Sequence, residues 1–159
     1  MFYNKHFIVY PVVELFARQT KMINVNDLKK RMNKKGMPLL IVDARDVTSF
    51  YKGHIPGARS LFDGDLIAMA RNLDKNTDIV VFGPGQARAS RDPMDRLAGD
   101  AIDRLNKMGF RNVMALDGGF EAWANGGNRV DTSKPESIKA GNMLTYDQLS
   151  QFFGGLGGL

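Results

Sequence analysis

The chain has 159 residues, of which 43% are hydrophobic and 25% charged, the composition of one ordinary globular domain that can bury its own core. The sequence contains no cysteine, which excludes disulfides, thiolate metal sites and a cysteine nucleophile. With 2 histidines far apart in the sequence, no metal site and no cofactor are predicted. The net charge of +5 is spread along the chain, which favours a solvated basic surface over nucleic acid or another anionic partner.

Residues 1–22 are expected to form an N-terminal extension. The apolar run at residues 7–10 predicts a strand, and residues 11–19 predict a helix with Pro11 at its first position. No apolar run is long enough to span a membrane, and charged residues such as Glu14 interrupt the apolar core that a signal peptide needs. The predicted location is therefore the cytoplasm.

Between residues 23 and 127, short apolar segments alternate with segments of helical period. Strands are predicted at residues 23–25, 39–42, 58–61, 79–82 and 112–116, and helices at residues 26–33, 64–72, 93–108 and 119–125. Asn24 or Asn26 is expected to cap the first of these helices, and Asp92 the third. The alternation predicts an α/β fold, a parallel sheet of about five strands with helices on both faces.

Two segments carry recognisable motifs. Residues 43–58 read DARDVTSFYKGHIPGA, with a turn of restricted or unusual backbone at residues 53–57, and residues 116–123 read LDGGFEAW, with a tight glycine turn. Together they resemble the two signatures of the rhodanese-like family, within the rhodanese and cell-cycle phosphatase superfamily. The resemblance implies a domain over residues 23–127.

Three residues of the first motif are expected near the functional site. Asp43 and Arg45 end the second strand, where they are expected on opposite sides of the pleat. The resemblance implies that they form a structural ion pair near the active loop. It also implies that His54 is a structural residue that hydrogen-bonds its own turn.

The loop at residues 83–92 follows the strand at residues 79–82, and ligands of parallel sheets bind at such strand ends. The resemblance implies a catalytic cysteine at the first loop position and an arginine five residues later. In this chain these positions are Gly83 and Arg88, so no catalytic residue is predicted. Ser90 would need a nearby base to act as a nucleophile. The candidates for an anion-binding loop, through backbone N–H groups and positive charge, are Gly83, Gly85, Gln86, Ala87, Arg88, Ser90 and Arg91.

Residues 128–159 are expected to form a C-terminal extension. Residues 128–139 are polar and predict a linker or loosely attached arm. A short amphipathic helix capped by Thr145 is predicted after it, and the final GGLGGL is expected to be disordered.

Three hypotheses of function follow. The leading one is a catalytically inactive rhodanese-like domain that acts as a binding or regulatory module, with a protein partner or a second copy bound through the terminal segments. The alternative is non-covalent binding of a small oxyanion or sulfur species by the 83–92 loop. The third is an active thiosulfate sulfurtransferase or phosphatase, which the resemblance ties to the missing cysteine.

Overall fold

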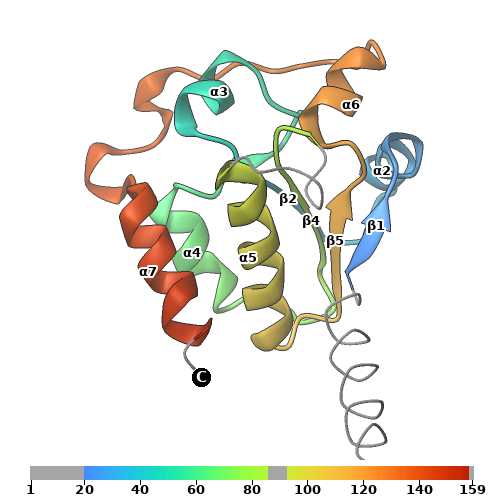
Figure 1. Cartoon of the computed structure of the whole chain (residues 1–159). Coiled ribbons are helices and arrows are strands. Elements are labelled where there is room, and N and C mark those ends of the chain that lie inside the picture. The colour runs from blue at the N-terminus through green and yellow to red at the C-terminus, as the bar shows by residue number, and fades with distance from the viewer. Residues whose placement is uncertain (1–19, 86–92, 158–159) are drawn as a thin grey trace, which may run out of the picture.

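A computed structural model of the chain describes residues 20–85 and 93–157 and contains a five-stranded sheet in which all neighbouring strands are parallel (Figure 1). Its order is β1-β5-β4-β2-β3. The strands are β1 (Lys21–Ile23), β2 (Leu39–Asp43), β3 (Arg59–Ser60), β4 (Asp78–Phe82) and β5 (Asn112–Leu116). The predicted α/β fold with about five parallel strands is confirmed.

Helices cover both faces of the sheet, as the alternation of segments predicts (Figure 1). Side chains from α4, α5 and α7 pack on one face, and side chains from α2 and α6 pack on the other. The helices are α2 (Val25–Met32), α3 (Val47–Lys52), α4 (Gly64–Ala70), α5 (Pro93–Lys107), α6 (Gly119–Asn125) and α7 (Tyr146–Gly157), with 3₁₀ turns η1 (Pro135–Ser137) and η2 (Ala140–Asn142). Within the described ranges, none of these helices has the length and apolarity to cross a membrane.

The central strands are buried on both faces, and their side chains divide the core into two clusters. In β2, Leu40 and Val42 belong to the cluster under α4, α5 and α7, whereas Ile41 belongs to the cluster under α2 and α6. Trp123 of α6 is 3% exposed in the second cluster. Asp43, two residues after Ile41, continues the α2 and α6 side of the strand.

Some predicted boundaries are wrong by one or two residues. The first strand was expected at residues 23–25 but is Lys21–Ile23, because the Asn24 side chain already caps α2 by accepting a hydrogen bond from the Asp27 N–H at 2.8 Å. The third strand and the helix after it are shorter than expected, at Arg59–Ser60 and Gly64–Ala70. Asp92, the expected cap of α5, lies outside the described residues.

The expectation of a loosely attached arm after residue 127 is wrong. The His54 N–H donates to the Asp131 carbonyl at 2.8 Å, and the Asp131 N–H donates back to the His54 carbonyl at 2.9 Å. The indole N–H of Trp123 donates to the Arg129 carbonyl at 2.8 Å. This polar segment is thus attached to the first motif by an isolated antiparallel bridge and to the second motif by the Trp123 indole.

The helix after the arm is also part of the fold. Thr145 caps α7 as predicted, since its hydroxyl accepts from the Gln148 N–H at 3.2 Å while the Gln148 side chain accepts from the Thr145 N–H at 2.8 Å. Leu149 is fully buried in the cluster under α4 and α5. The disorder expected for the final glycine-rich stretch is wrong as far as Gly157, where α7 ends.

Replacing Leu149 tests whether α7 contributes to the core. Leu149→Ala is expected to lower the free energy of unfolding by about 3 kcal/mol, because it leaves a cavity at a fully buried position. Gln151→Ala, at an exposed position of the same helix, is the matched control and should change it by less than about 0.5 kcal/mol. Equal effects in urea denaturation would contradict the packing of α7.

Candidate functional site

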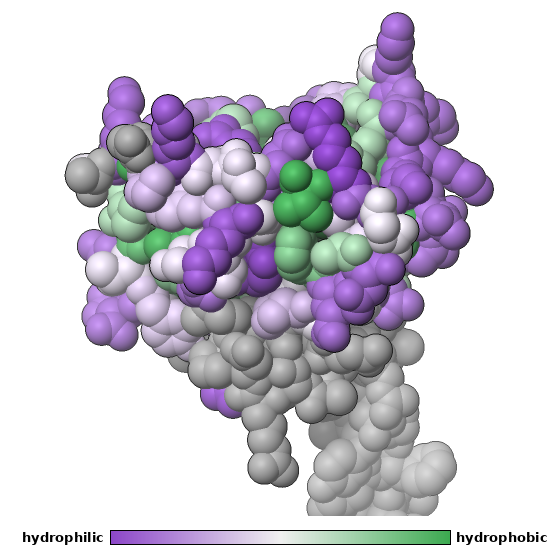
Figure 2. Space-filling view, turned by 90° about the horizontal axis from the view of Figure 1, so that it is seen from above, coloured by the Kyte–Doolittle hydropathy of each residue, from purple (hydrophilic) through white to green (hydrophobic). Residues whose placement is uncertain are grey.

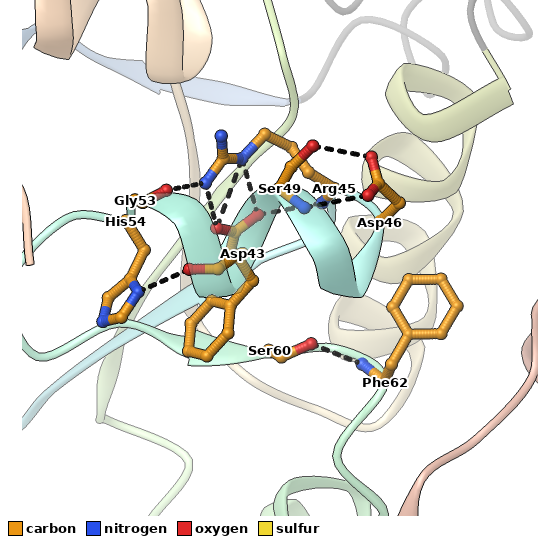
Figure 3. Close-up of polar contacts among 9 residues, drawn as sticks. Asp43, Arg45, Asp46, Ser49, Gly53, His54, Ser60 and Phe62 are labelled. Carbon is orange, nitrogen blue, oxygen red and sulfur yellow. Dashed lines mark hydrogen bonds and ion pairs between the residues drawn. The ribbon is translucent and has the colours of Figure 1, made fainter. Parts of the chain in front are cut away.

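Asp43 and Arg45 form a buried ion pair at the carboxyl end of β2 (Figure 3). Asp43 is fully buried and Arg45 is 7% exposed. The Arg45 guanidinium donates from Nη2 to Oδ2 of Asp43 at 2.7 Å and from Nε to Oδ1 at 3.1 Å. The ion pair expected from the resemblance is therefore present. The expectation of opposite sides is wrong, because residues two apart in an extended chain point to the same side.

Arg45 also connects the other elements that meet at this edge of the sheet. Its Nη2 donates to the Gly53 carbonyl at 2.6 Å, at the end of α3. Its guanidinium carbon lies 3.8 Å from the ring centre of Phe120 in α6 and 5.7 Å from that of Phe82 in β4. One cation thus contacts a carboxylate, a carbonyl and two aromatic rings, which fixes β2, β4, α3 and α6 relative to one another.

The local environment shifts the pKa of two carboxyl groups. Complete burial raises the pKa of Asp43, and the hydrogen bonds and charge of Arg45 oppose this rise. Asp46 caps α3 by accepting from the Ser49 N–H at 2.9 Å and the Ser49 hydroxyl at 2.8 Å. Partial burial would raise the pKa of Asp46, but these bonds outweigh it and the pKa is lowered. Asp43 thus belongs to the buried ion pair, and Asp46 caps the start of α3.

His54 is held by α3 and not by its own turn, which corrects the expectation. Its ring stacks on Phe50 with a centroid distance of 4.1 Å, and its Nδ1 donates to the Phe50 carbonyl at 2.8 Å. Gly53 has an extended backbone with φ of 174°, so its backbone is not of the unusual kind expected. Instead, a Cβ at Gly53 would lie 2.7 Å from Cγ1 of Val130, so the closely packed arm favours glycine there.

Gly83 follows β4 and is buried against the start of α6. Its carbonyl accepts from the Phe120 N–H at 3.0 Å, and the Pro84 carbonyl accepts from the Glu121 N–H at 3.1 Å. These two backbone N–H groups at the start of α6 are therefore hydrogen-bonded to backbone carbonyls that follow β4. Gly119 has a φ of +59°, and a Cβ there would lie 2.6 Å from the Gly83 carbonyl oxygen. The glycine pair forms the predicted tight turn because the two segments approach this closely.

The structure places only part of the predicted anion-binding loop. Gly83 and Gly85 lie at the end of β4, next to Gly119. The other candidates lie outside the described residues, so the anion-binding loop stays a prediction; they are Gln86, Ala87, Arg88, Ser90 and Arg91. Among the described residues, no group of three or more His, Cys, Asp or Glu side chains could hold a metal ion.

The face above α3 and α6 is mainly hydrophilic (Figure 2). A small hydrophobic patch lies near the middle of the coloured surface. Val130, in the arm that crosses this end of the molecule, is 38% exposed. Isolated apolar side chains of this kind are normal on protein surfaces. The coloured part of this face therefore gives no sign of a broad apolar docking surface.

Sequence reasoning missed two partners of Arg45: the Phe120 ring and the Gly53 carbonyl. Phe120 directly follows the glycine pair in the second motif, and Gly53 opens the turn in the first. The signal available was that both motifs follow strands whose carboxyl ends meet at one edge of a parallel sheet. That rule predicts proximity, but it does not predict which atoms meet.

Comparison with known proteins assigns the chain to a family. The model of the rhodanese-like domain matches residues 24–126. The chain belongs to the rhodanese-like family. The thiosulfate sulfurtransferase GlpE of Shewanella oneidensis is 33% identical over 103 residues, covering 65% of this chain and 91% of that protein. The enzyme of the same name from Pseudomonas putida is 35% identical over 86 residues, covering 53% and 68%.

Solved structures agree with this assignment. The crystal structure of the Alr3790 protein from Anabaena sp. has a TM-score of 0.56 and 29% identity, covering 70% of this chain and 82% of that chain. The solution structure of the rhodanese-like domain of Alr3790 has a TM-score of 0.55 and 28% identity, covering 77% and 86%. The family match ends at residue 126, before the arm and α7.

Breaking the buried ion pair between Asp43 and Arg45 should lower the stability of the fold. Arg45→Met is expected to lower the free energy of unfolding by about 3–5 kcal/mol, because it leaves the Asp43 carboxylate buried without its partner. The double variant Asp43→Leu/Arg45→Met should recover much of this loss. Arg129→Met is the matched control, since its ion pair with Asp131 is exposed and should contribute at most about 1 kcal/mol. A double variant no more stable than Arg45→Met in urea denaturation would contradict the buried-charge explanation.

Two Gly→Ala substitutions should have opposite effects on the melting temperature. Gly119→Ala is expected to destabilise the protein by about 1–3 kcal/mol, because its positive φ and the nearby Gly83 carbonyl both oppose a side chain. Gly99→Ala, within α5, meets no atom within 4 Å of the added Cβ and should stabilise by about 0.5–1 kcal/mol. A melting temperature raised by Gly119→Ala would contradict the close approach of α6 to Gly83.

Proposed function

We propose that this member of the rhodanese-like family acts by binding and does not transfer sulfur. The observation that carries the proposal is the absence of cysteine from the whole sequence, with Gly83 at the position where the family resemblance implies the nucleophile. A persulfide is a covalent bond from transferred sulfur to a cysteine sulfur, and this chain supplies no atom that could form it. The activity printed for its relatives, thiosulfate sulfurtransferase, is therefore not expected here.

The groups around Gly83 make structural contacts. The Gly83 and Pro84 carbonyls are hydrogen-bonded to the start of α6, and Gly119 allows the two backbones to touch. Such packing serves as a structural junction between β4 and α6. The Asp43–Arg45 pair next to it is satisfied by neighbouring groups and holds the same edge together. The described part of the site thus has the attributes of a scaffold, which a binding domain requires as much as an enzyme does.

The proposed partner is another protein or a second copy of this chain. Leu149, an apolar residue of the C-terminal segment expected to bind a partner or a second copy, is buried within its own domain. Residues 1–19 of the N-terminal extension lie outside the described residues. Sedimentation velocity of the full chain addresses self-association, and a purely monomeric chain would leave a different protein as the partner. The cytoplasmic location stays a prediction from the sequence.

A sulfurtransferase assay tests whether the chain transfers sulfur. The full chain, given thiosulfate and cyanide, is expected to form thiocyanate no faster than a protein-free control. Gly83→Cys is expected to gain measurable turnover, because it places a thiol at the proposed nucleophile position, and Gly99→Cys, with a thiol in α5, is the matched control without turnover. Turnover by the unmodified chain would overturn the proposal. Equal inactivity of both cysteine variants would contradict the assignment of Gly83 to the nucleophile position.

A further inference from the structure

A cavity of about 100 Å³ lies between α4, α5 and β2. It is on the opposite face of the sheet from the Asp43–Arg45 pair, because its β2 lining residues, Leu40 and Val42, alternate with Ile41 and Asp43. Among the described residues, apolar side chains from α4 and α5 form most of the remaining wall. The described residues that line the cavity include none from the two motifs at residues 43–58 and 116–123.

The space remains open because two small residues face it from neighbouring helices. Ala70 of α4 and Ala101 of α5 both line the cavity and are 8% and 1% exposed. Protein interiors are normally packed to the density of organic crystals, and a void of this size forfeits stability. A larger apolar residue at either position would fill it. A partly open apolar space beside two alanines has the chemistry of a small-molecule pocket, at the size of a short hydrocarbon chain.

The rim of the cavity is positively charged. Arg71, directly after α4, lines the cavity and is exposed, and its side chain makes no ion pair or hydrogen bond with the described part of the chain. Arg104 of α5 also lines it, half-buried and with a partner of its own. Among the described residues, no carboxylate belongs to the lining. The interior is thus suited to a hydrocarbon group, and the rim is suited to an anion.

We propose that this cavity binds a short-chain carboxylic acid, with the hydrocarbon chain between α4 and α5 and the carboxylate at Arg71. An engineered cavity of about 150 Å³ holds the six carbons of benzene, so about 100 Å³ accommodates roughly four carbons, with the carbon next to the carboxylate at the rim. The Arg71 guanidinium has the fork geometry that pairs with a carboxylate. The cavity is too small for a helix of a partner protein, and the free guanidinium at its rim favours an acid over a neutral hydrocarbon. This inference is independent of whether the chain transfers sulfur.

Three probes separate the contributions of chain and charge. The full, ¹⁵N-labelled chain is titrated with hexanoate, with 1-hexanol, which has the chain without the charge, and with acetate, which has the charge without the chain. Hexanoate is expected to give saturable amide shifts in α4 and α5 around residues 66–71 and 101–108. Hexanol should bind at the same place about tenfold more weakly, since it lacks the charge-assisted bond, and acetate should give no saturable shift there.

Matched variants assign the site. Ala101→Leu fills the cavity and should abolish hexanoate binding while the melting temperature stays the same or rises, and Ala70→Leu is a second filling variant from the other helix. Arg71→Gln should weaken hexanoate about tenfold and leave hexanol unchanged, whereas Lys107→Gln, which removes a charge outside the lining, should change neither. No saturable shifts in α4 and α5, unchanged hexanoate affinity in a folded filling variant, or equal affinity for hexanoate and hexanol would overturn the proposal.

Discussion

The buried ion pair between Asp43 and Arg45 holds together the edge of the sheet where the family motifs meet. A fully buried carboxylate is stable only when charge and hydrogen bonds replace the water that it has lost. Arg45 supplies both, and its remaining contacts reach the Gly53 carbonyl and the Phe120 ring. Removing this one cation would therefore leave an uncompensated charge and also remove its contacts with the end of α3 and with α6.

The same edge anchors the segment beyond the family match. The Gly53 carbonyl accepts a hydrogen bond from Arg45, and the lack of a side chain at Gly53 leaves space for Val130 of the arm. The next residue, His54, exchanges two backbone hydrogen bonds with Asp131. The turn of the first motif thus supports the ion pair on one side and the arm on the other. These contacts explain why the polar arm after residue 127 packs against the domain.

Much of the fold could be predicted from the sequence because a parallel α/β sheet has strong local signals. Buried strands are continuous apolar runs, and the helices between them keep a period of 3.6. Residues 112–116 and 119–125 were predicted with the bounds that the structure gives them. The arm could not be predicted in this way, since its attachment depends on backbone N–H and carbonyl groups that every polar segment also carries.

The residues of the site could be predicted from the sequence, but their arrangement could not. Asp43 and Arg45 were expected to pair, and they do, yet their relative direction was wrong although the two-residue period of a strand determines it. The contacts of Arg45 with Phe120 and Gly53 come from tertiary packing between segments far apart in the sequence. Local pattern carries no information on such contacts. The composition, in contrast, carried the main functional argument. A chain without cysteine cannot form a cysteine persulfide, whatever the geometry of its site.

The two faces of the sheet differ in how far they depart from the family's domain. The face of α2 and α6 lies within the family match and ends in the ion pair. The opposite face bears α7, which lies beyond the match and inserts Leu149 into the same cluster as Leu66 and Ala101. The cavity lies on this face as well. The helix outside the family match thus packs on the face that carries α4, α5 and the cavity, and binding at that face is the property to measure.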